Sequence, residues 1–351
     1  MAIDRPNHGQ GIGLKVVADE LGLSQSTVSR ALRNHPSIPA ATRERVAQAA
    51  KRMGYAPNAR ARGLAIGRTE AIGLVFPLER LRLVQTNFVD VLSGISDVVT
   101  ERGYNLLLSP FRDDESSVLR RLATSRMVDG LIITRPLVHD PRIALLAGTG
   151  IPFVVHGRSD VDISCSYVDV DNFEIFRRLA EVLLDYGHRR IAALNSYRRF
   201  RYAAARDAGY RAAMEGRHVP VDPDLVLETA MTEEDGLKLG ARLLSLPEPP
   251  TAIICGSIFL AKGVYRAAAE AGRTIGKDLS VVAHDDQLRG ISAADFAPAL
   301  TATQQSVEMA GRRLAEILID RLEGRLAPEP ICEVSRPDLI LRGSVGQGKP
   351  V

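Results

Sequence analysis

The residue types that could do chemistry near the start of the chain are amides, hydroxyls and guanidinium groups, gathered within residues 24–34. Gln25 can pair with adenine through two hydrogen bonds, and Arg30 can pair with guanine in the same bidentate manner. Hydroxyl groups such as those of Thr27 and Ser29 can hold phosphate oxygens. These side chains could therefore read DNA, provided that one helix presents them together.

Two short helices joined by a glycine turn would give that presentation. Apolar spacing predicts a first helix over residues 14–21 and a second over residues 25–34, each with one buried face. Gly22 suits the sharp turn after the first helix. Ser24 can cap the second helix. The polar side chains then face away from the core, as reading a major groove requires.

Charge divides the chain into a basic head and a slightly acidic body. Residues 1–68 hold eleven Lys or Arg against four Asp or Glu, a net charge of +7. The remaining 283 residues carry a net charge of −4. This asymmetry indicates that the head meets a polyanion and the body does not.

A third helix is predicted from residue 39 or 40 to residue 53, ended by Gly54 and Pro57. The next eight residues, 58–65, are basic with some helical propensity. So short a segment does not hold a helix in water unaided, and Gly63 weakens it by about 1 kcal/mol. Residues 58–68 are expected to be a linker that a partner orders.

Residues 14–68 resemble the DNA-binding head and hinge of the lac repressor (LacI/GalR) family. The matching motifs are Val17-Ala18, Gly22-Leu23-Ser24, Thr27-Val28-Ser29-Arg30, Thr42-Arg43-Glu44-Arg45-Val46 and Gly54-Tyr55-Ala56-Pro57-Asn58. The resemblance implies that the second helix faces bases in the major groove and that a hinge helix enters the minor groove with Leu64 as a wedge. Gly63 departs from the family pattern and would loosen the hinge. The expected DNA contacts are Ser24, Gln25, Ser26, Thr27, Ser29, Arg30, Asn34, Asn58, Ala61 and Leu64.

From residue 70 onward, apolar strands alternate with amphipathic helices. Strands are predicted at residues 71–76, 104–108, 130–133, 151–155, 190–194, 252–255 and 279–283, and helices at 88–102, 116–125, 172–186, 203–215 and 260–271. Repeated βα units imply parallel sheets covered by helices on both faces. The predicted fold class is α/β: an all-α helix-turn-helix head and a core of two doubly wound, parallel-sheet lobes. Ligands bind such sheets at the carboxyl ends of the strands, so a cleft between the lobes is the expected site.

The body resembles the periplasmic-binding-protein-like core of the same family, in which the chain crosses between lobes three times. The matching motifs are Val128-Asp129-Gly130-Leu131-Ile132, Arg206-Asp207-Ala208-Gly209-Tyr210, Asp285-Asp286, Pro298-Ala299-Leu300-Thr301-Ala302 and Gly311-Arg312-Arg313-Leu314-Ala315. The expected organisation is a head at 1–57 (1–11 disordered), a hinge and linker at 58–68, a first lobe at 69–168 with 301–324, and a second lobe at 169–300 with 328–344.

The resemblance also implies an effector site in the cleft. Arg206 would reach toward the effector, and Asp285 would accept hydrogen bonds from it, although Asp285 could instead be a helix cap or turn residue. The expected effector contacts are Phe88, Thr134, Arg206, Met231, Ser257, His284 and Asp285. Met231, Ser257 and His284 depart from the family pattern, and His284 could equally fill space near a strand end. A sugar or sugar derivative is the expected effector, with a purine or another metabolite as the alternative.

Other classes of protein fit less well. A solute-binding protein shares the body but needs a signal peptide and has no basic head. No P-loop, GxSxG or HExxH motif is present, and the adjacent residues Asp285 and Asp286 should point apart, so no enzyme is expected. The three cysteines have neither disulfide nor metal-ligand spacing, and no cofactor is expected. No apolar run is long enough to cross a bilayer. The prediction is a cytoplasmic regulator that binds a near-palindromic double-stranded operator as a homodimer, with a tetramer as the alternative.

Overall fold

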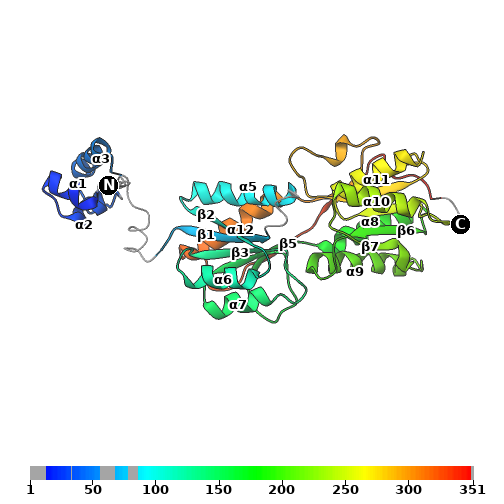
Figure 1. Cartoon of the computed structure of the whole chain (residues 1–351), viewed down its shortest axis with the longest axis horizontal. Helices are drawn as coiled ribbons and strands as arrows, with labels where there is room; N and C mark the ends of the chain where they lie inside the picture. The colour runs from blue at the N-terminus through cyan, green and yellow to red at the C-terminus, as the bar shows by residue number, and fades with distance from the viewer. Residues whose placement is uncertain (1–12, 33, 56–67, 78–85, 349–351) are drawn as a thin grey trace, which may run out of the picture. The chain divides into compact units, whose positions relative to one another are not determined.

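The computed structural model describes residues 13–32, 34–55, 68–77 and 86–348 (Figure 1). The chain forms two compact units, Met1–Thr69 and Glu70–Val351. The first unit holds the helical head. The second holds two sheets and the helices that cover them.

The head consists of helices α1 (Leu14–Leu21), α2 (Gln25–Leu32) and α3 (Ala40–Met53). Gly22 ends α1 with a left-handed φ of 65°, and Gly54 ends α3 with a φ of 68°, so both glycines act as the sequence predicted. The apolar faces of the three helices form one small core, made of Val17, Ala18, Val28, Ala31, Ile38 and Val46. The polar side of α2 is left outside it.

The first sheet of the body is entirely parallel, with strand order β11-β5-β4-β3-β1-β2. Its strands are β1 (Ala71–Pro77), β2 (Asn105–Phe111), β3 (Gly130–Thr134), β4 (Phe153–His156), β5 (Ser166–Val170) and β11 (Cys332–Ser335). Helices α5 (Thr86–Glu101) and α12 (Val307–Leu322) cover one face, and α6 (Glu115–Thr124) and α7 (Pro141–Thr149) cover the other (Figure 1). Successive side chains of a strand point to opposite faces of the sheet, so Val154 packs toward α5 and α12, while Val155 packs toward α6 and α7.

The second sheet has strand order β12-β10-β9-β8-β6-β7, and only β12 runs antiparallel to its neighbour. Its strands are β6 (Ile191–Asn195), β7 (Val226–Glu228), β8 (Ala252–Cys255), β9 (Ser280–Asp285), β10 (Thr301–Gln304) and β12 (Asp338–Ile340). Helices α8 (Asn172–Asp185) and α9 (Arg201–Gly216) pack on one face, and α10 (Glu233–Leu244) and α11 (Ile258–Glu270) on the other. The predicted α/β class with two lobes is confirmed.

Two crossings between the lobes fall at other residues than the sequence suggested. Residues 301–324 were expected in the first lobe, but β10 pairs with β9 of the second sheet, and the chain crosses between Gln304 and Val307. Residues 328–344 were expected in the second lobe, but β11 pairs with β5 of the first sheet. The crossing strands are only three or four residues long, too short for periodicity to assign them to either sheet.

Helix α12 is held close against α5, and this contact fixes one wall of the space between the lobes. A Cβ atom added at Gly94 of α5 would lie 2.0 Å from the Glu308 carbonyl oxygen, and one at Gly311 of α12 would lie 2.2 Å from the Val91 carbonyl oxygen. Only glycine allows the two backbones to approach so closely. The first turn of α12 therefore has a fixed place beside the strand ends.

Candidate functional site

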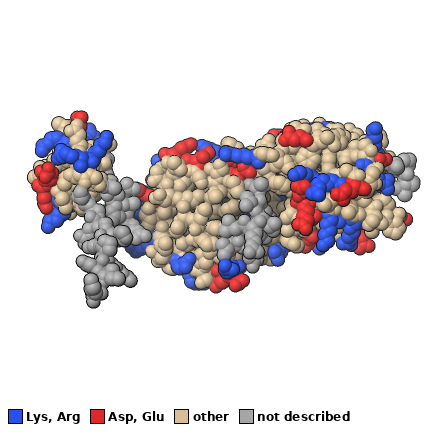
Figure 2. Space-filling view, turned by 45° about the horizontal axis from the view of Figure 1, so that its top comes forward, with Lys and Arg blue, Asp and Glu red and all other residues tan. Residues whose placement is uncertain are grey.

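The exposed side of α2 presents the polar side chains that the sequence singled out. Gln25, Ser26 and Arg30 are exposed on this helix. Ser24 caps it, because its Oγ accepts a hydrogen bond from the Thr27 amide at 3.1 Å and lies 2.8 Å from the hydroxyl oxygens of Ser26 and Thr27. Arg30 is held along the helix by a hydrogen bond from its Nε to the Ser26 carbonyl oxygen at 3.3 Å. In the view of Figure 2, Lys and Arg side chains gather on the head.

The remaining predicted DNA contacts lie at the edges of this surface. Asn34 follows α2 with a left-handed φ of 53° and is exposed. Its carbonyl oxygen accepts a hydrogen bond from Arg43 Nη1 of α3 at 3.0 Å, which fixes the turn between the two helices. Ser29 is half-buried on α2. Asn58, Ala61 and Leu64 lie outside the described residues, as does most of the predicted hinge.

In the body, Arg206 of α9 is buried and held from two sides. Its Nε donates to Asn172 Oδ1 at 2.9 Å, and its Nη1 donates to the Gly256 carbonyl oxygen at 2.8 Å. Its guanidinium carbon lies 5.3 Å from the centre of the Tyr202 ring and 5.9 Å from that of Phe176. Burial lowers the pKa of Arg206, and the charges of Asp286 and Asp169 partly offset this effect. The arginine is a fixed, desolvated cation of the second lobe.

A cavity of about 190 Å³, here named the cleft cavity, lies where the strand ends of the two lobes meet. His156 ends β4, Asp169 lies near the end of β5, and His284 and Asp286 lie at the end of β9. The whole lining comprises His156, Val168, Asp169, Val170, His284, Asp286, Gln305, Ser306, Val307, Met309, Ala310, Arg313, Glu333 and Ser335. The cavity therefore joins carboxylates and imidazoles to an apolar wall from α12, at the carboxyl ends of strands where a ligand was expected.

Asp286 is one of three carboxylates, with Asp169 and Glu333, that line this cavity. Burial alone raises the pKa of Asp286, but the hydrogen bond to His284 and the positive charge of Arg206 outweigh burial, so the pKa lies below its ordinary value. His284 Nε2 lies 3.3 Å from Asp286 Oδ1, and its Nδ1 lies 3.0 Å from Thr303 Oγ1. Burial lowers the pKa of His284, so we assign a neutral ring that donates from Nε2 to the carboxylate and accepts at Nδ1 from the threonine hydroxyl.

Asp285 was the expected ligand acceptor, but both of its carboxylate oxygens accept hydrogen bonds from the protein itself. Its Oδ1 accepts from the Gln287 amide at 2.8 Å, and its Oδ2 accepts from the Ala293 amide at 3.2 Å and from Gln304 Nε2 at 3.0 Å. Three donors within the protein therefore use this buried carboxylate to hold the loop after β9. Adjacent residues at a strand end point to opposite sides, and it is Asp286 that lines the cleft cavity.

The other expected effector contacts are dispersed. Ser257 caps α11 by accepting from the Leu260 amide at 3.2 Å and donates to the Met231 carbonyl oxygen at 3.1 Å. Met231 has a left-handed φ of 66°. Phe88 lies 5.8 Å, centre to centre, from the Phe76 ring. The carbonyl oxygen of Thr134 accepts from Arg142 Nη2 at 3.2 Å. Of the seven expected contacts, only His284 lines the cleft cavity, and their roles toward an effector stay predictions.

Sequence reasoning missed Asp169, Asn172, His156 and Asp286 as members of the site. Asn172 links the two lobes, because its Oδ1 accepts from Arg206 while its Nδ2 donates to Asp169 Oδ1 at 3.2 Å. A usable signal was present: each of these residues lies within two residues of the carboxyl end of a strand, where parallel sheets gather ligand contacts.

Comparison with known proteins decides the family. Residues 13–58 match the bacterial regulatory proteins of the lacI family, and residues 180–345 match a periplasmic binding protein-like domain. The HTH-type transcriptional regulator AglR of Rhizobium meliloti (strain 1021) is 40% identical over 337 residues, which cover 95% of this chain and 94% of that protein. The chain belongs to the lacI family of bacterial transcriptional regulators. It is a ligand-responsive transcriptional regulator, in a family of regulators and not of enzymes.

Further relatives extend over nearly the same length. The HTH-type transcriptional regulator RafR of Escherichia coli is 36% identical, covering 91% of this chain and 94% of that protein. The solved complex of the regulator CelR with cellobiose has 29% identity and a TM-score of 0.69, covering 95% of this chain and 100% of that one. The lac repressor dimer bound to operator and the anti-inducer ONPF shares the fold, with a TM-score of 0.83 at 24% identity over 95% of this chain and 99% of that one.

Two further findings concern other kinds of site. Among the described residues, no helix is both long and apolar enough to span a membrane. Within the same part of the chain, no group of three or more His, Cys, Asp or Glu residues could hold a metal ion.

Proposed function

We propose that this lacI-family member is a saccharide-responsive repressor whose effector binds in the cleft cavity. The observation that carries the proposal is the carboxylate of Asp286, which lines the cleft cavity beside His284 and whose pKa is lowered in part by the charge of the buried Arg206. Saccharide hydroxyls can donate to the carboxylate and accept from the guanidinium. In a desolvated site, such a pair rejects ligands that leave either partner unsatisfied.

A relative supports the ligand class. CelR of Thermobifida fusca is 30% identical over 94% of this chain and 97% of that protein, and a CelR structure contains cellobiose. In our proposal, Arg206 and Asp286 bind saccharide hydroxyls, and Val307 and Met309 of α12 contact the apolar edge of the sugar ring. Asn172 positions Arg206 by accepting from its Nε.

For DNA binding, the proposal depends on α2 and on a homodimer with two-fold symmetry. Gln25, Ser26 and Arg30 read base edges, while Thr27 and Ser29 bind phosphates. A homodimer places two heads on the half-sites of a near-palindromic operator. Saccharide binding changes the angle between the lobes of each subunit, and with it the spacing of the two heads. A coupling free energy of about 1–3 kcal/mol suffices to change operator occupancy 5- to 150-fold.

A thermal-shift screen of the full chain against mono- and disaccharides and against purines tests this function. We expect a saccharide to raise the unfolding temperature, and the same saccharide to weaken binding of the full chain to its operator in a mobility-shift titration. A response to purines alone would replace the saccharide with the purine alternative. If neither class changes stability or DNA binding, the proposal is wrong.

A further inference from the structure

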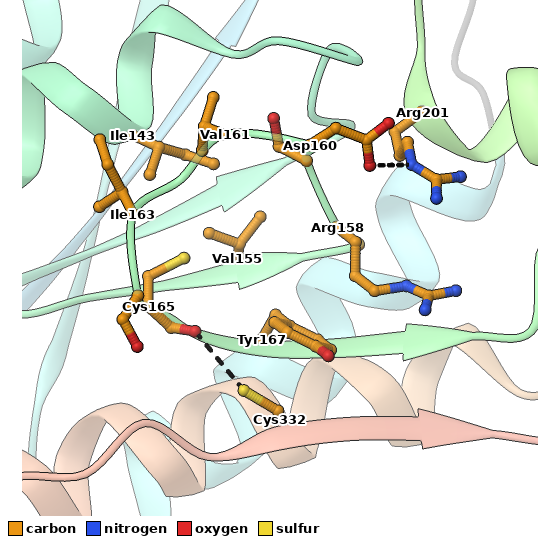
Figure 3. Close-up of a pocket in the computed structure, with 13 residues that line it drawn as sticks. Ile143, Val155, Arg158, Asp160, Val161, Ile163, Cys165, Tyr167, Arg201 and Cys332 are labelled. Atoms are coloured by element: carbon orange, nitrogen blue, oxygen red, sulfur yellow. Dashed lines mark hydrogen bonds and ion pairs between the residues drawn. The ribbon is translucent and has the colours of Figure 1, made fainter.

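A second cavity, larger than the cleft cavity, lies under the loop that joins β4 to β5. Its volume is about 280 Å³ (Figure 3). The loop supplies most of the lining, and α7, α9 and β11 each add a residue. The lining comprises Ile143, Val155, Gly157, Arg158, Ser159, Asp160, Val161, Ile163, Ser164, Cys165, Tyr167, Arg201 and Cys332. None of these residues lines the cleft cavity.

The two ends of this cavity differ in chemistry. Ile143, Val161 and Ile163 gather at one side in Figure 3, whereas Arg158 and Arg201 lie together at the opposite side. The first group belongs to the apolar core between the sheet and α7 or packs against it. The cavity is thus amphipathic, with a hydrocarbon wall facing two guanidinium groups.

Each guanidinium at this end of the cavity is paired with one carboxylate. Arg158 donates from Nε to Asp169 Oδ2 at 2.7 Å, and Arg201 donates from Nε to Asp160 Oδ1 at 2.6 Å. Asp160 is the acidic residue of the lining, and Asp169 contacts Arg158 from outside it, so the lining residues alone sum to +1. Each arginine uses its Nε for a carboxylate, and the Nη groups of a guanidinium can donate further hydrogen bonds to an added anion. Arg201 is also the first residue of the 16-residue helix α9, whose amino end favours negative charge.

We propose that this cavity is a second ligand site, for a small organic acid with an apolar body. The carboxylate would lie between Arg158 and Arg201, and the hydrocarbon part would cover Ile143, Val155 and Ile163. The two arginines come from different lobes, so an acid in this position bridges the first lobe to α9 of the second.

One carboxylate connects this acid site to the cleft cavity. Asp169 accepts from Arg158 and from Asn172, and Asn172 in turn holds Arg206. An anion that draws Arg158 away from Asp169 leaves more negative charge beside the cleft cavity. Acid binding is therefore expected to change saccharide affinity. This coupling rests on the proposed function, whereas binding of the acid does not.

Isothermal titration of the full chain with hexanoate, 1-hexanol and acetate tests the site. We expect saturable hexanoate binding at least about tenfold tighter than that of hexanol, which lacks the charge, or acetate, which lacks the apolar body. R201Q and R158Q should each weaken hexanoate about tenfold or more. R211Q is the matched control, because Arg211 lies on the same helix and pairs through Nε with Asp207 at 2.8 Å but does not line the cavity. It should bind hexanoate as the unaltered chain does.

Absence of saturable binding by hexanoate overturns the acid site, and so does equal binding by hexanol or equal weakening in R211Q. Unfolding temperatures of the variants show whether a loss reflects misfolding, and R201Q changes a residue at a helix start, where the packing cost is small. A second titration, of the saccharide found in the screen with and without saturating hexanoate, tests the coupling alone. Unchanged saccharide affinity would refute the link through Asp169 and leave the acid site standing.

Discussion

Asp169 and Arg158 form an ion pair, with 2.7 Å between Arg158 Nε and Asp169 Oδ2, and the two residues line different cavities. The carboxylate faces the space between the lobes, while the guanidinium faces the loop side of the first lobe. Because Asp169 also accepts from Asn172, a change at either cavity alters the charge balance at the other. This pair is a direct polar connection between the two sites.

Replacing Arg206 with lysine should abolish the effector response and leave operator binding intact. Lysine keeps the charge but cannot donate to both Asn172 and the Gly256 carbonyl oxygen in the planar geometry of arginine. One buried acceptor then loses its donor, at a cost of about 1–3 kcal/mol in the free energy of unfolding. Operator titrations with and without saccharide measure the response. R211K, on the exposed side of the same helix, is the control, and a normal response in R206K would remove Arg206 from the site.

An Asn substitution at Asp286 should mainly weaken saccharide binding, whereas one at Asp285 should mainly lower stability. D286N removes the charge that faces the cleft cavity and should weaken saccharide binding about tenfold or more, with a smaller loss of stability than D285N. D285N removes an oxygen that accepts from the protein itself and should lower the free energy of unfolding by about 1–3 kcal/mol. Calorimetry and urea unfolding on both variants separate the two roles. The reverse pattern would restore Asp285 as the ligand acceptor.

Truncation of Arg30 to alanine should relax selectivity at one base pair of the operator. A bidentate contact with a base edge contributes about 1–3 kcal/mol of discrimination. Competition of single-substituted operators, measured at one salt concentration, gives the loss position by position. K15A, which removes an exposed cation on α1, should instead weaken all sequences alike. Unaltered selectivity in R30A would exclude Arg30 from base reading.

Stability should fall as the pH drops below about 6.5, because buried histidines are held neutral. His188 Nδ1 lies 2.9 Å from Thr251 Oγ1, and its Nε2 lies 2.9 Å from Ser280 Oγ. Burial lowers the pKa of His188 below its ordinary value of 6.5. The unfolded chain therefore binds this proton more tightly than the folded chain, so the contribution is complete above about pH 6.5 and is lost as the pH falls through the lower, folded-state pKa.

The unfolding temperature between pH 7.5 and 5 measures this dependence. H188Q should be less stable at pH 7.5 and should lose less on acidification than the unaltered chain. H139Q, at an exposed histidine, should keep the full dependence. If the unfolding temperature of H188Q fell with pH as steeply as that of the unaltered chain, other groups would be responsible for the loss of stability in acid.

The parts of the fold that were predictable from sequence are those with a strong local signal. Buried apolar runs marked β1 and β3, and the Gly22 turn with the Ser24 cap marked the head. Helices α7 and α10 were not identified, although Asp140 caps α7 ahead of Pro141 and Thr232 forms a capping box with Asp235. The choice between Asp285 and Asp286 was beyond the sequence, because the orientation of a strand's last residues depends on the loop that follows it.

The last two strands in the chain, β11 and β12, affect how the chain folds during its synthesis. Strand β11 forms one edge of the first sheet, and β12 forms one edge of the second. Both leave the ribosome after residue 331, when the rest of each lobe has already been made. A product that stops short of Cys332 would leave β5 and β10 as open edges in the same molecule, and unpaired edges recruit other chains. Premature termination therefore yields an aggregation-prone fragment in place of a regulator with one damaged lobe.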